Sequence, residues 1–121
     1  MYNDKVLQHF ENPRHTGELA DANGIGTVGN PACGDMMKLY LKIEADRIVD
    51  IRFKTFGCAA AIATSSIASE MVLGKSLDEA SGMTAQDIVD ELGGLPERKI
   101  LCSTLAPDAI KAAIADFHSR S

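Results

Sequence analysis

Two short runs of alternating apolar and polar residues constrain the fold of this chain more than any other feature of its sequence. Alternation with a period of two is typical of β-strands that bury one face and expose the other. The apolar members of the two runs are Leu39, Leu41, Ile43, Val49, Ile51 and Phe53. Because only a short Ala45-Asp46 link separates the runs, we predict an antiparallel hairpin rather than a crossover connection.

A short amphipathic helix is predicted near the N-terminus. The apolar stripe that would face the core consists of Tyr2, Val6, Leu7 and Phe10. Either Asn3 or Asp4 can cap this helix, and the Asn12-Pro13 pair is expected to end it.

Further helical segments follow the hairpin. The segment from Ala59 to about Leu73 is rich in Ala and Ile, which predicts a helix buried on most sides that ends at Gly74. Other helices are expected over residues 76–80, 84–92 and 105–117. A helix, then strands, then helices indicate an α+β fold, with a small antiparallel sheet of about three strands and helices packed on one face. The length of 121 residues suits one domain that spans 1–121.

A glycine- and asparagine-rich loop is expected from Thr16 to about Gly29, with one short edge strand inside it. Part of this loop, residues 24–29, matches the GxGxxG pattern of dinucleotide-binding proteins. That fingerprint requires a strand before it and a helix after it. Here a helix and a loop precede the pattern and Asn30-Pro31 follow it. We therefore interpret residues 24–29 as a flexible loop that leads to the turn at Cys33.

Composition and charge exclude several functional classes. The net charge of -5 argues against a protein that binds the phosphate backbone of nucleic acids. No uninterrupted apolar run reaches the roughly 18 residues that a membrane-spanning helix needs, so no contact with a membrane is expected. The first residues lack the apolar core of a signal peptide. We therefore expect a cytoplasmic protein.

The three cysteines are the residues best suited to carry chemistry. An odd number of cysteines in a chain that is expected to stay in a reducing compartment argues for free thiols over a disulfide framework. Cys33, Cys58 and Cys102 each lie where one predicted element gives way to another. Cys58 and Cys102 also come just before predicted helices, where the helix dipole favours a thiolate. The thiolate is the form that binds soft metals and accepts sulfur.

Asp35 is the natural fourth ligand, because it follows Cys33 closely in the sequence. Three thiolates and one carboxylate would complete a four-coordinate zinc site or bind the irons of a small cluster. A carboxylate is a harder and more labile ligand for cluster iron than a thiolate, which would favour release of the cluster. The alternative is that each cysteine is simply a small buried hydrophobic residue. Glycines beside Cys33 and Cys58 and the loop positions of all three cysteines favour a site.

Around these residues the sequence resembles the IscU/NifU family of iron–sulfur cluster scaffolds over nearly its whole length. The resemblance rests on separate segments in the family order, which are His9-Phe10-Glu11-Asn12-Pro13-Arg14, Gly29-Asn30-Pro31-Ala32-Cys33-Gly34-Asp35, Thr55-Phe56-Gly57-Cys58-Ala59-Ala60-Ala61-Ile62-Ala63-Thr64-Ser65-Ser66 and Cys102-Ser103-Thr104-Leu105-Ala106.

The resemblance implies an α+β fold in which the cysteines and an aspartate meet at one exposed end. It implies that Cys33, Asp35, Cys58 and Cys102 bind the cluster or metal. It further implies that a cysteine desulfurase supplies sulfur and that the product is a [2Fe-2S] cluster delivered to apo-proteins. Zinc is often bound in the same site within the family. The protein would then be a scaffold or carrier and not an enzyme.

Two departures from the family pattern modify these expectations. Typical IscU proteins have a histidine directly before the last cysteine, where this chain has Leu101, so Asp35 is expected to be the sole non-cysteine ligand. The family segment Leu-Pro-Pro-Val-Lys, which a specialised Hsp70 chaperone reads, is Leu95-Pro96-Glu97-Arg98-Lys99 here. Its charged middle residues argue against a dedicated chaperone partner. The insertion of zinc-dependent SufU proteins and the extra domains of NifU proteins are not found, so a stand-alone scaffold is expected.

Ordinary structural roles are expected for the remaining polar residues with catalytic potential. His9 is expected to be a partly exposed helix residue, His15 a loop residue and His118 a solvated residue near the C-terminus. Ser65 and Ser66 have no histidine or acid placed in the sequence to activate them. Hydrogen bonding to the helix backbone is the expected role of both hydroxyls.

Two functions remain open from the sequence. In the first, the chain is a scaffold on which sulfur and iron form a cluster that then leaves. In the second, zinc orders the site and a cysteine leaves the metal to accept persulfide sulfur from a desulfurase. Cys102 and Cys33 are the candidate persulfide acceptors, because both lie in predicted loops. A purely structural zinc domain is disfavoured by Asp35, since such sites prefer a closed shell of cysteine and histidine.

Overall fold

The computed structural model describes residues 3–13, 15–30, 34–94 and 104–120. The elements within these residues are α1 (Asp4–Glu11), β1 (Gly24–Asn30), β2 (Asp35–Glu44), β3 (Arg47–Phe56), α2 (Ala59–Val72), α3 (Leu77–Ser81), α4 (Ala85–Leu92) and α5 (Leu105–Arg120). The strands form one antiparallel sheet, which confirms the predicted α+β class. The bounds of α2 to α5 differ little from the predicted ones, except that α5 continues beyond Phe117 to Arg120.

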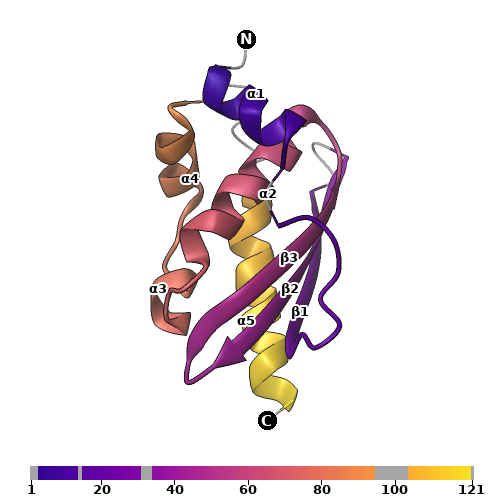
Figure 1. Cartoon of the computed structure of the whole chain (residues 1–121), viewed down its shortest axis with the longest axis vertical. Coiled ribbons are helices and arrows are strands. Elements are labelled where there is room, and N and C mark those ends of the chain that lie inside the picture. The colour runs from indigo at the N-terminus through magenta and orange to yellow at the C-terminus, as the bar shows by residue number, and fades with distance from the viewer. Residues whose placement is uncertain (1–2, 14, 31–33, 95–103, 121) are drawn as a thin grey trace.

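The sheet has the strand order β1-β2-β3, and the helices cover one of its faces (Figure 1). β2 and β3 form the predicted hairpin, in which Ala45 and Asp46 have φ angles of 52° and 61°. Two consecutive positive φ angles are typical of the tight turns that join antiparallel strands. On the covered face, α5 packs against β1 and β2, α2 packs against β3, and α1 packs against α2. This layering produces a single core between the sheet and the helices.

A register shift between Lys42 and Ile43 changes which residues of β3 face the core. Val49, which the alternation placed in the core, is 48% exposed. The prediction was wrong because a bulge interrupts strict alternation and moves the inward face by one position. The buried apolar residues of β3 are Ile48, Ile51 and Phe53.

The first helix also buries a different face from the predicted one. Val6 and His9 are buried, whereas Leu7 and Phe10 are exposed to 37% and 40%. The cap is Asn3, whose Oδ1 accepts a hydrogen bond of 2.9 Å from the backbone N–H of Val6. The predicted stripe was therefore wrong for Leu7 and Phe10, although the helix itself was predicted correctly.

Buried hydroxyl groups connect α2 to its surroundings. Ser65 Oγ donates a hydrogen bond of 2.8 Å to the carbonyl of Ala61, as predicted for a serine inside a helix. Ser66 Oγ lies 2.7 Å from Nδ1 of His9. The expectation of a partly exposed His9 was wrong, because this contact joins α1 to α2 inside the protein, where His9 is only 6% exposed.

The segment that precedes β1 covers the sheet face opposite the helices (Figure 1). Gly17 donates a hydrogen bond to the backbone of β3, and Asn23 donates one to the backbone of β2. Between these anchors, Glu18 forms an ion pair of 2.6 Å with Lys54. Tyr40 belongs to the face predicted to be wet, yet it is buried. The segment anchored at Gly17, Glu18 and Asn23 lies over this face and supplies the reason.

Residues 24–30 form the edge strand β1, which confirms the short edge strand expected within residues 16–29. The interpretation of residues 24–29 as a flexible loop was wrong. A Cβ atom on Gly26 would lie 2.6 Å from the carbonyl oxygen of Ala109 and 2.6 Å from the backbone nitrogen of Ala113. Glycine therefore allows α5 to approach the strand closely. Asp116 of α5 also accepts a hydrogen bond of 2.9 Å from the N–H of Ile25. The glycines that resemble a nucleotide fingerprint thus serve helix–sheet packing.

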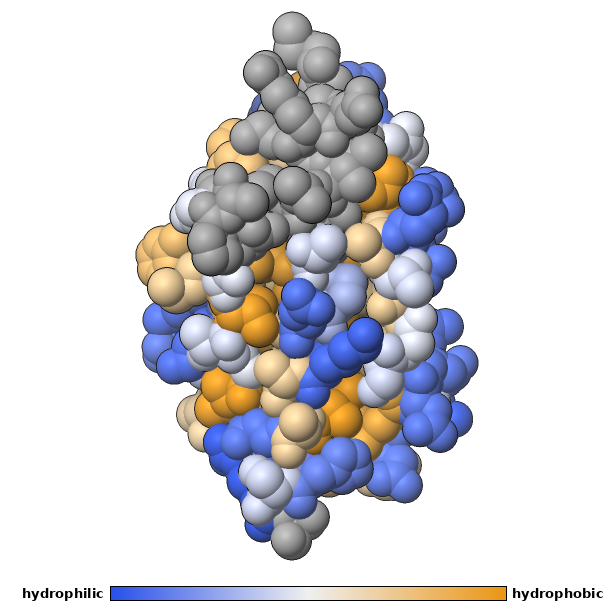
Figure 2. Space-filling model, turned by 180° about the vertical axis from the view of Figure 1, so that it is seen from behind, coloured by the Kyte–Doolittle hydropathy of each residue, from blue (hydrophilic) through white to orange (hydrophobic). Residues whose placement is uncertain are grey.

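Hydrophilic and hydrophobic residues are intermixed on the reverse side of the molecule (Figure 2). Among the described helices, none is both long enough and apolar enough to cross a membrane.

Candidate functional site

One end of the hairpin meets the start of α2, and two of the four predicted ligands lie at this junction. Asp35 is the first residue of β2, and Cys58 is the N-cap residue of α2. The paired Met36 and Phe56 hold the ends of β2 and β3 together beside them. Asp35 is only 4% exposed, whereas Cys58 is partly exposed. The fold therefore brings a buried carboxylate next to an accessible thiol.

Asp35 binds Cys58 through both carboxylate oxygens. Its Oδ1 accepts a hydrogen bond of 3.1 Å from the backbone N–H of Cys58. Its Oδ2 lies 3.7 Å from the Cys58 sulfur, within the range of a thiol hydrogen bond. The Cys58 side chain forms no capping bond to its own helix, so the carboxylate from β2 occupies the position of a helix cap. Negative charge at this position is favoured by the dipole of α2.

Gly57 creates the space that Asp35 occupies. Its φ angle is +152°, a conformation that residues with side chains rarely adopt. A Cβ atom at this position would lie 2.9 Å from the Cβ of Asp35 and nearer still to its carboxylate. In the sequence, this glycine indicates only a loop beside Cys58, and its steric role is not predicted. Only the contact with Asp35, which is distant in sequence, reveals that role.

Cys33, Cys102 and Leu101 lie outside the described residues, as do Leu95 to Lys99. Asn30 and Asp35, the last residue of β1 and the first of β2, are cross-strand partners in the β1–β2 ladder. The chain segment that joins these two partners contains Cys33. Within the described part of the chain, no three His, Cys, Asp or Glu side chains gather into a metal-binding group. The predicted set of ligands is thus represented there by the Asp35–Cys58 pair, and the full set remains a prediction.

Large apolar side chains are exposed beside this pair. Phe56 is 68% exposed and its partner across the ladder, Met36, is 47% exposed. A second feature nearby is a groove of about 500 Å³ lined by Phe56, Ile62 and residues of the segment before β1. Exposed apolar residues around a polar site are common where a partner protein binds.

Comparisons with known proteins show which family the chain resembles. The model of the NifU-like N-terminal domain matches residues 1–121. The protein named iron-sulfur cluster assembly scaffold protein IscU 1 in Archaeoglobus fulgidus is 54% identical over 121 residues, which cover 100% of this chain and 79% of the relative. The scaffold protein IscU of Escherichia coli K12 is 55% identical, and the match covers 98% of this chain and 95% of the relative.

The fold is also found in solved structures. The crystal structure of a NifU-like N-terminal protein from Brucella abortus superimposes with a TM-score of 0.79 over 98% of this chain and 95% of that chain, at 23% sequence identity. At this identity the match concerns the fold alone. Because the family model matches residues 1–121 and the relatives are 54% and 55% identical along the chain, the protein belongs to the family of the NifU-like N-terminal domain, together with the IscU scaffold proteins.

Proposed function

We propose that this chain is a scaffold on which a [2Fe-2S] cluster is assembled from iron and desulfurase-derived sulfur and then passed to apo-proteins. The observation that carries the proposal is the contact between Asp35 and Cys58, a carboxylate and a thiol held together at an accessible end of the sheet. The names of the Archaeoglobus and Escherichia coli relatives, both cluster assembly scaffolds, support the same role.

The proposed ligands are Cys33, Asp35, Cys58 and Cys102. Thiolates suit cluster iron, and the carboxylate supplies a harder, weaker ligand. The geometry of Asp35 supports this weakness, because its Oδ1 already accepts the Cys58 N–H and Oδ2 is the oxygen that faces the sulfur. Cys33 comes two residues before Asp35 in the sequence, which supports its inclusion in this set. Zinc can occupy the same set of ligands.

The sulfur chemistry requires partners. A desulfurase persulfide transfers one sulfane sulfur to a cysteine thiolate, for which Cys102 and Cys33 are the candidates. Two electrons must then reduce that sulfur to the sulfide of a cluster, so a reductant is needed as well as ferrous iron. The chain itself would act as a carrier and not as an enzyme. We propose the cytoplasm as the site of action and no dedicated Hsp70-type chaperone, in line with the charged Glu97 and Arg98.

The test is anaerobic reconstitution of the protein with a cysteine desulfurase, cysteine, ferrous iron and dithiothreitol as the reductant. We expect visible charge-transfer bands together with matched amounts of iron and acid-labile sulfide. Cys58→Ser should lose these bands while its circular dichroism spectrum stays that of the wild type, so that lost assembly is not confused with unfolding. Wild-type assembly in Cys58→Ser would remove Cys58 from the site.

The same experiment separates the scaffold from the zinc-bound sulfur acceptor. The acceptor function predicts that zinc persists and that the desalted protein carries no acid-labile sulfide after the full reaction. In a parallel reaction without dithiothreitol, which would reduce a persulfide, mass spectrometry should then find the added sulfur only as a cysteine persulfide. That result would contradict the scaffold proposal.

A further inference from the structure

We infer that a groove between α2, α3 and α4 is a docking site for a basic amphipathic helix of a partner protein. The groove has a volume of about 610 Å³. It lies away from the Asp35–Cys58 pair, because Cys58 caps the N-terminal end of α2 whereas Met71 and Val72 lie at its C-terminal end. A helix of 14 residues is about 20 Å long, so the two ends are well separated.

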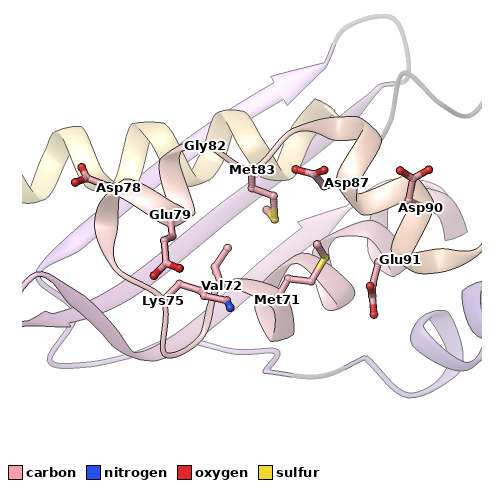
Figure 3. A pocket seen from close by; sticks show the side chains of 10 residues that line it. All are labelled: Met71, Val72, Lys75, Asp78, Glu79, Gly82, Met83, Asp87, Asp90 and Glu91. Carbon is pink, nitrogen blue, oxygen red and sulfur yellow. The ribbon is translucent and has the colours of Figure 1, made fainter.

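Flexible apolar side chains form the floor of the groove. Met71 and Val72 of α2 point toward Met83, which follows α3, so that both sulfur atoms lie in the centre of the view in Figure 3. Val72 and Met83 are buried and Met71 is partly exposed. Methionine adapts its shape to different apolar partners, and surfaces rich in methionine are used by proteins that bind amphipathic helices.

Carboxylates border this floor at both ends (Figure 3). Asp78 and Glu79 come from α3, and Asp87, Asp90 and Glu91 come from α4. All five are exposed, and Lys75 is the single basic residue that lines the groove within the described part of the chain. Lys5 pairs with Glu91 at 3.5 Å, but carboxylates still outnumber basic residues around the apolar floor. This excess of negative charge complements a segment rich in lysine or arginine.

Two of these carboxylates are held in place before any partner binds. Glu79 accepts a hydrogen bond of 3.1 Å from the N–H of Ser76, and Asp87 accepts one of 3.0 Å from the N–H of Thr84. Both belong to capping boxes, in which the Ser76 and Thr84 hydroxyls accept hydrogen bonds from the backbone N–H groups of Glu79 and Asp87. Side chains that are already ordered lose less conformational entropy on binding.

An apolar floor with acidic borders matches one class of ligand. An amphipathic helix with large apolar side chains on one face would place them over the two methionines, and lysines that flank this face would lie beside the carboxylates. A second copy of this chain is the other source of basic residues to consider, since Lys38, Lys42 and Lys54 lie on β2 and β3. The experiment distinguishes these two occupants.

The probe is a labelled peptide of about 16 residues, long enough for several helical turns, with leucine at helical spacing and lysine elsewhere. A peptide of the same composition in scrambled order is the control. The protein is the full chain with ¹³C-labelled methionine methyl groups. We expect the helical peptide to shift the methyl resonances of Met71 and Met83 and to leave those of Met36 and Met37, at the other end of the fold, unchanged.

A pair of matched variants tests the acidic border. Asp78→Asn combined with Asp90→Asn removes two exposed charges from the groove, and Asp21→Asn combined with Glu44→Gln removes two exposed charges elsewhere. Loss of two surface ion pairs should weaken binding of the helical peptide to the first variant by about fivefold. Fluorescence anisotropy of the labelled peptide measures this affinity. The second variant should bind as the wild type does, and added salt should weaken binding to the wild type.

Three outcomes would overturn the inference. The first is equal binding of the helical and scrambled peptides, and the second is a shift at Met36 without one at Met71 and Met83. The third is self-association in sedimentation velocity that Asp78→Asn with Asp90→Asn abolishes, because a second copy would then occupy the groove. None of these results depends on cluster assembly, so failure here would leave the proposed scaffold function untouched.

Discussion

At the scale of single residues, Asp35 has two roles that compete. It accepts a hydrogen bond from the Cys58 N–H at the start of α2, and we propose that it also binds iron. A ligand engaged in both roles holds a metal less firmly than a thiolate does, which would keep the cluster transferable.

We predict that Asp35→Ala keeps the fold and lengthens the lifetime of a bound cluster. Loss of the hydrogen bond to Cys58 should lower the free energy of unfolding by about 1–3 kcal/mol, measured by urea denaturation. Cluster lifetime is measured as the decay of visible absorption after a chelator is added. Asp35→Asn is the matched control, because its amide oxygen can still accept the Cys58 N–H, and its stability should stay close to that of the wild type. Rapid cluster loss from Asp35→Ala would contradict the labile role of the carboxylate.

Gly57 leads to a second prediction at this scale. We expect Gly57→Ala to destabilise the protein by about 1–3 kcal/mol, because a Cβ atom would both overlap Asp35 and require an unfavourable backbone conformation. Gly17→Ala is the control, since Gly17 also has a positive φ, of +119°, but its Cβ would find no atom within 4 Å. Urea denaturation of both variants separates backbone strain from the clash. Equal destabilisation would show that Asp35 does not limit the size of residue 57.

At the scale of elements, the contact between β1 and α5 depends on a missing side chain. We predict that Gly26→Ala lowers the free energy of unfolding by about 1–3 kcal/mol, because overpacking displaces the helix from the strand. In Gly29→Ala, on the same strand, the nearest atom would be the Asp35 carbonyl oxygen at 3.5 Å, an ordinary contact. Thermal unfolding compares the two, and a Gly29→Ala variant as unstable as Gly26→Ala would refute close packing as the cause.

Local sequence signals predicted most elements of this fold. The hairpin followed from alternation and the short Ala45-Asp46 link, and the start of α4 followed from Thr84, which is its N-cap. The helix expected from Ser76 is α3, and Ser76 is its N-cap in the structure. The buried face of an element was harder to predict than the element itself. Val49 was misplaced because the bulge resets the alternation, and Tyr40 was misplaced because a distant segment covers it.

The candidate site was predictable in part for the same reason. Cys58 at the start of a helix could be inferred from the local pattern, and the structure places it there. The nearness of Asp35 to Cys58 followed from the family resemblance and not from spacing alone. His9 could not be predicted as a buried residue, because its partner Ser66 lies on another helix and no sequence signal links the two.

At the scale of the whole molecule, the carboxylates with altered pKa values connect separate parts of the fold. Glu18 holds the segment before β1 to Lys54 on β3, and the Lys54 hydrogen bond lowers the pKa of Glu18. Asp116 joins α5 to the outer strand β1, and the hydrogen bond from the Ile25 N–H lowers its pKa below the ordinary value of 3.8. Both groups therefore favour the folded state when they are ionised.

The sign of the pH dependence follows from the Asp116 contact. A carboxylate whose pKa is lower in the folded state contributes stability that is fully present above its unfolded pKa. That contribution is lost as the pH falls through the folded pKa, because the carboxyl is then protonated in the folded state as well as in the unfolded state. We therefore predict that Asp116→Asn is less stable than the wild type at neutral pH. The difference should shrink as the pH falls below 3.8 and vanish under more acidic conditions.

Urea denaturation of wild type and Asp116→Asn across this pH range measures the difference, and the carboxyl ¹³C resonance of Asp116 reports its titration directly. Arg120 also pairs with Asp116, at 3.0 Å, so part of the effect should weaken with added salt. The part that comes from the Ile25 N–H should persist, because a direct hydrogen bond is screened less. Asp21→Asn, an exposed acid in the turn before β1, should match the wild type at neutral pH. The free energy of unfolding of Asp116→Asn could instead differ from that of the wild type by the same amount at neutral and acidic pH. That result would mean that the amide disturbs the packing of α5 against β1 and that the charge of Asp116 does not stabilise the edge of the sheet.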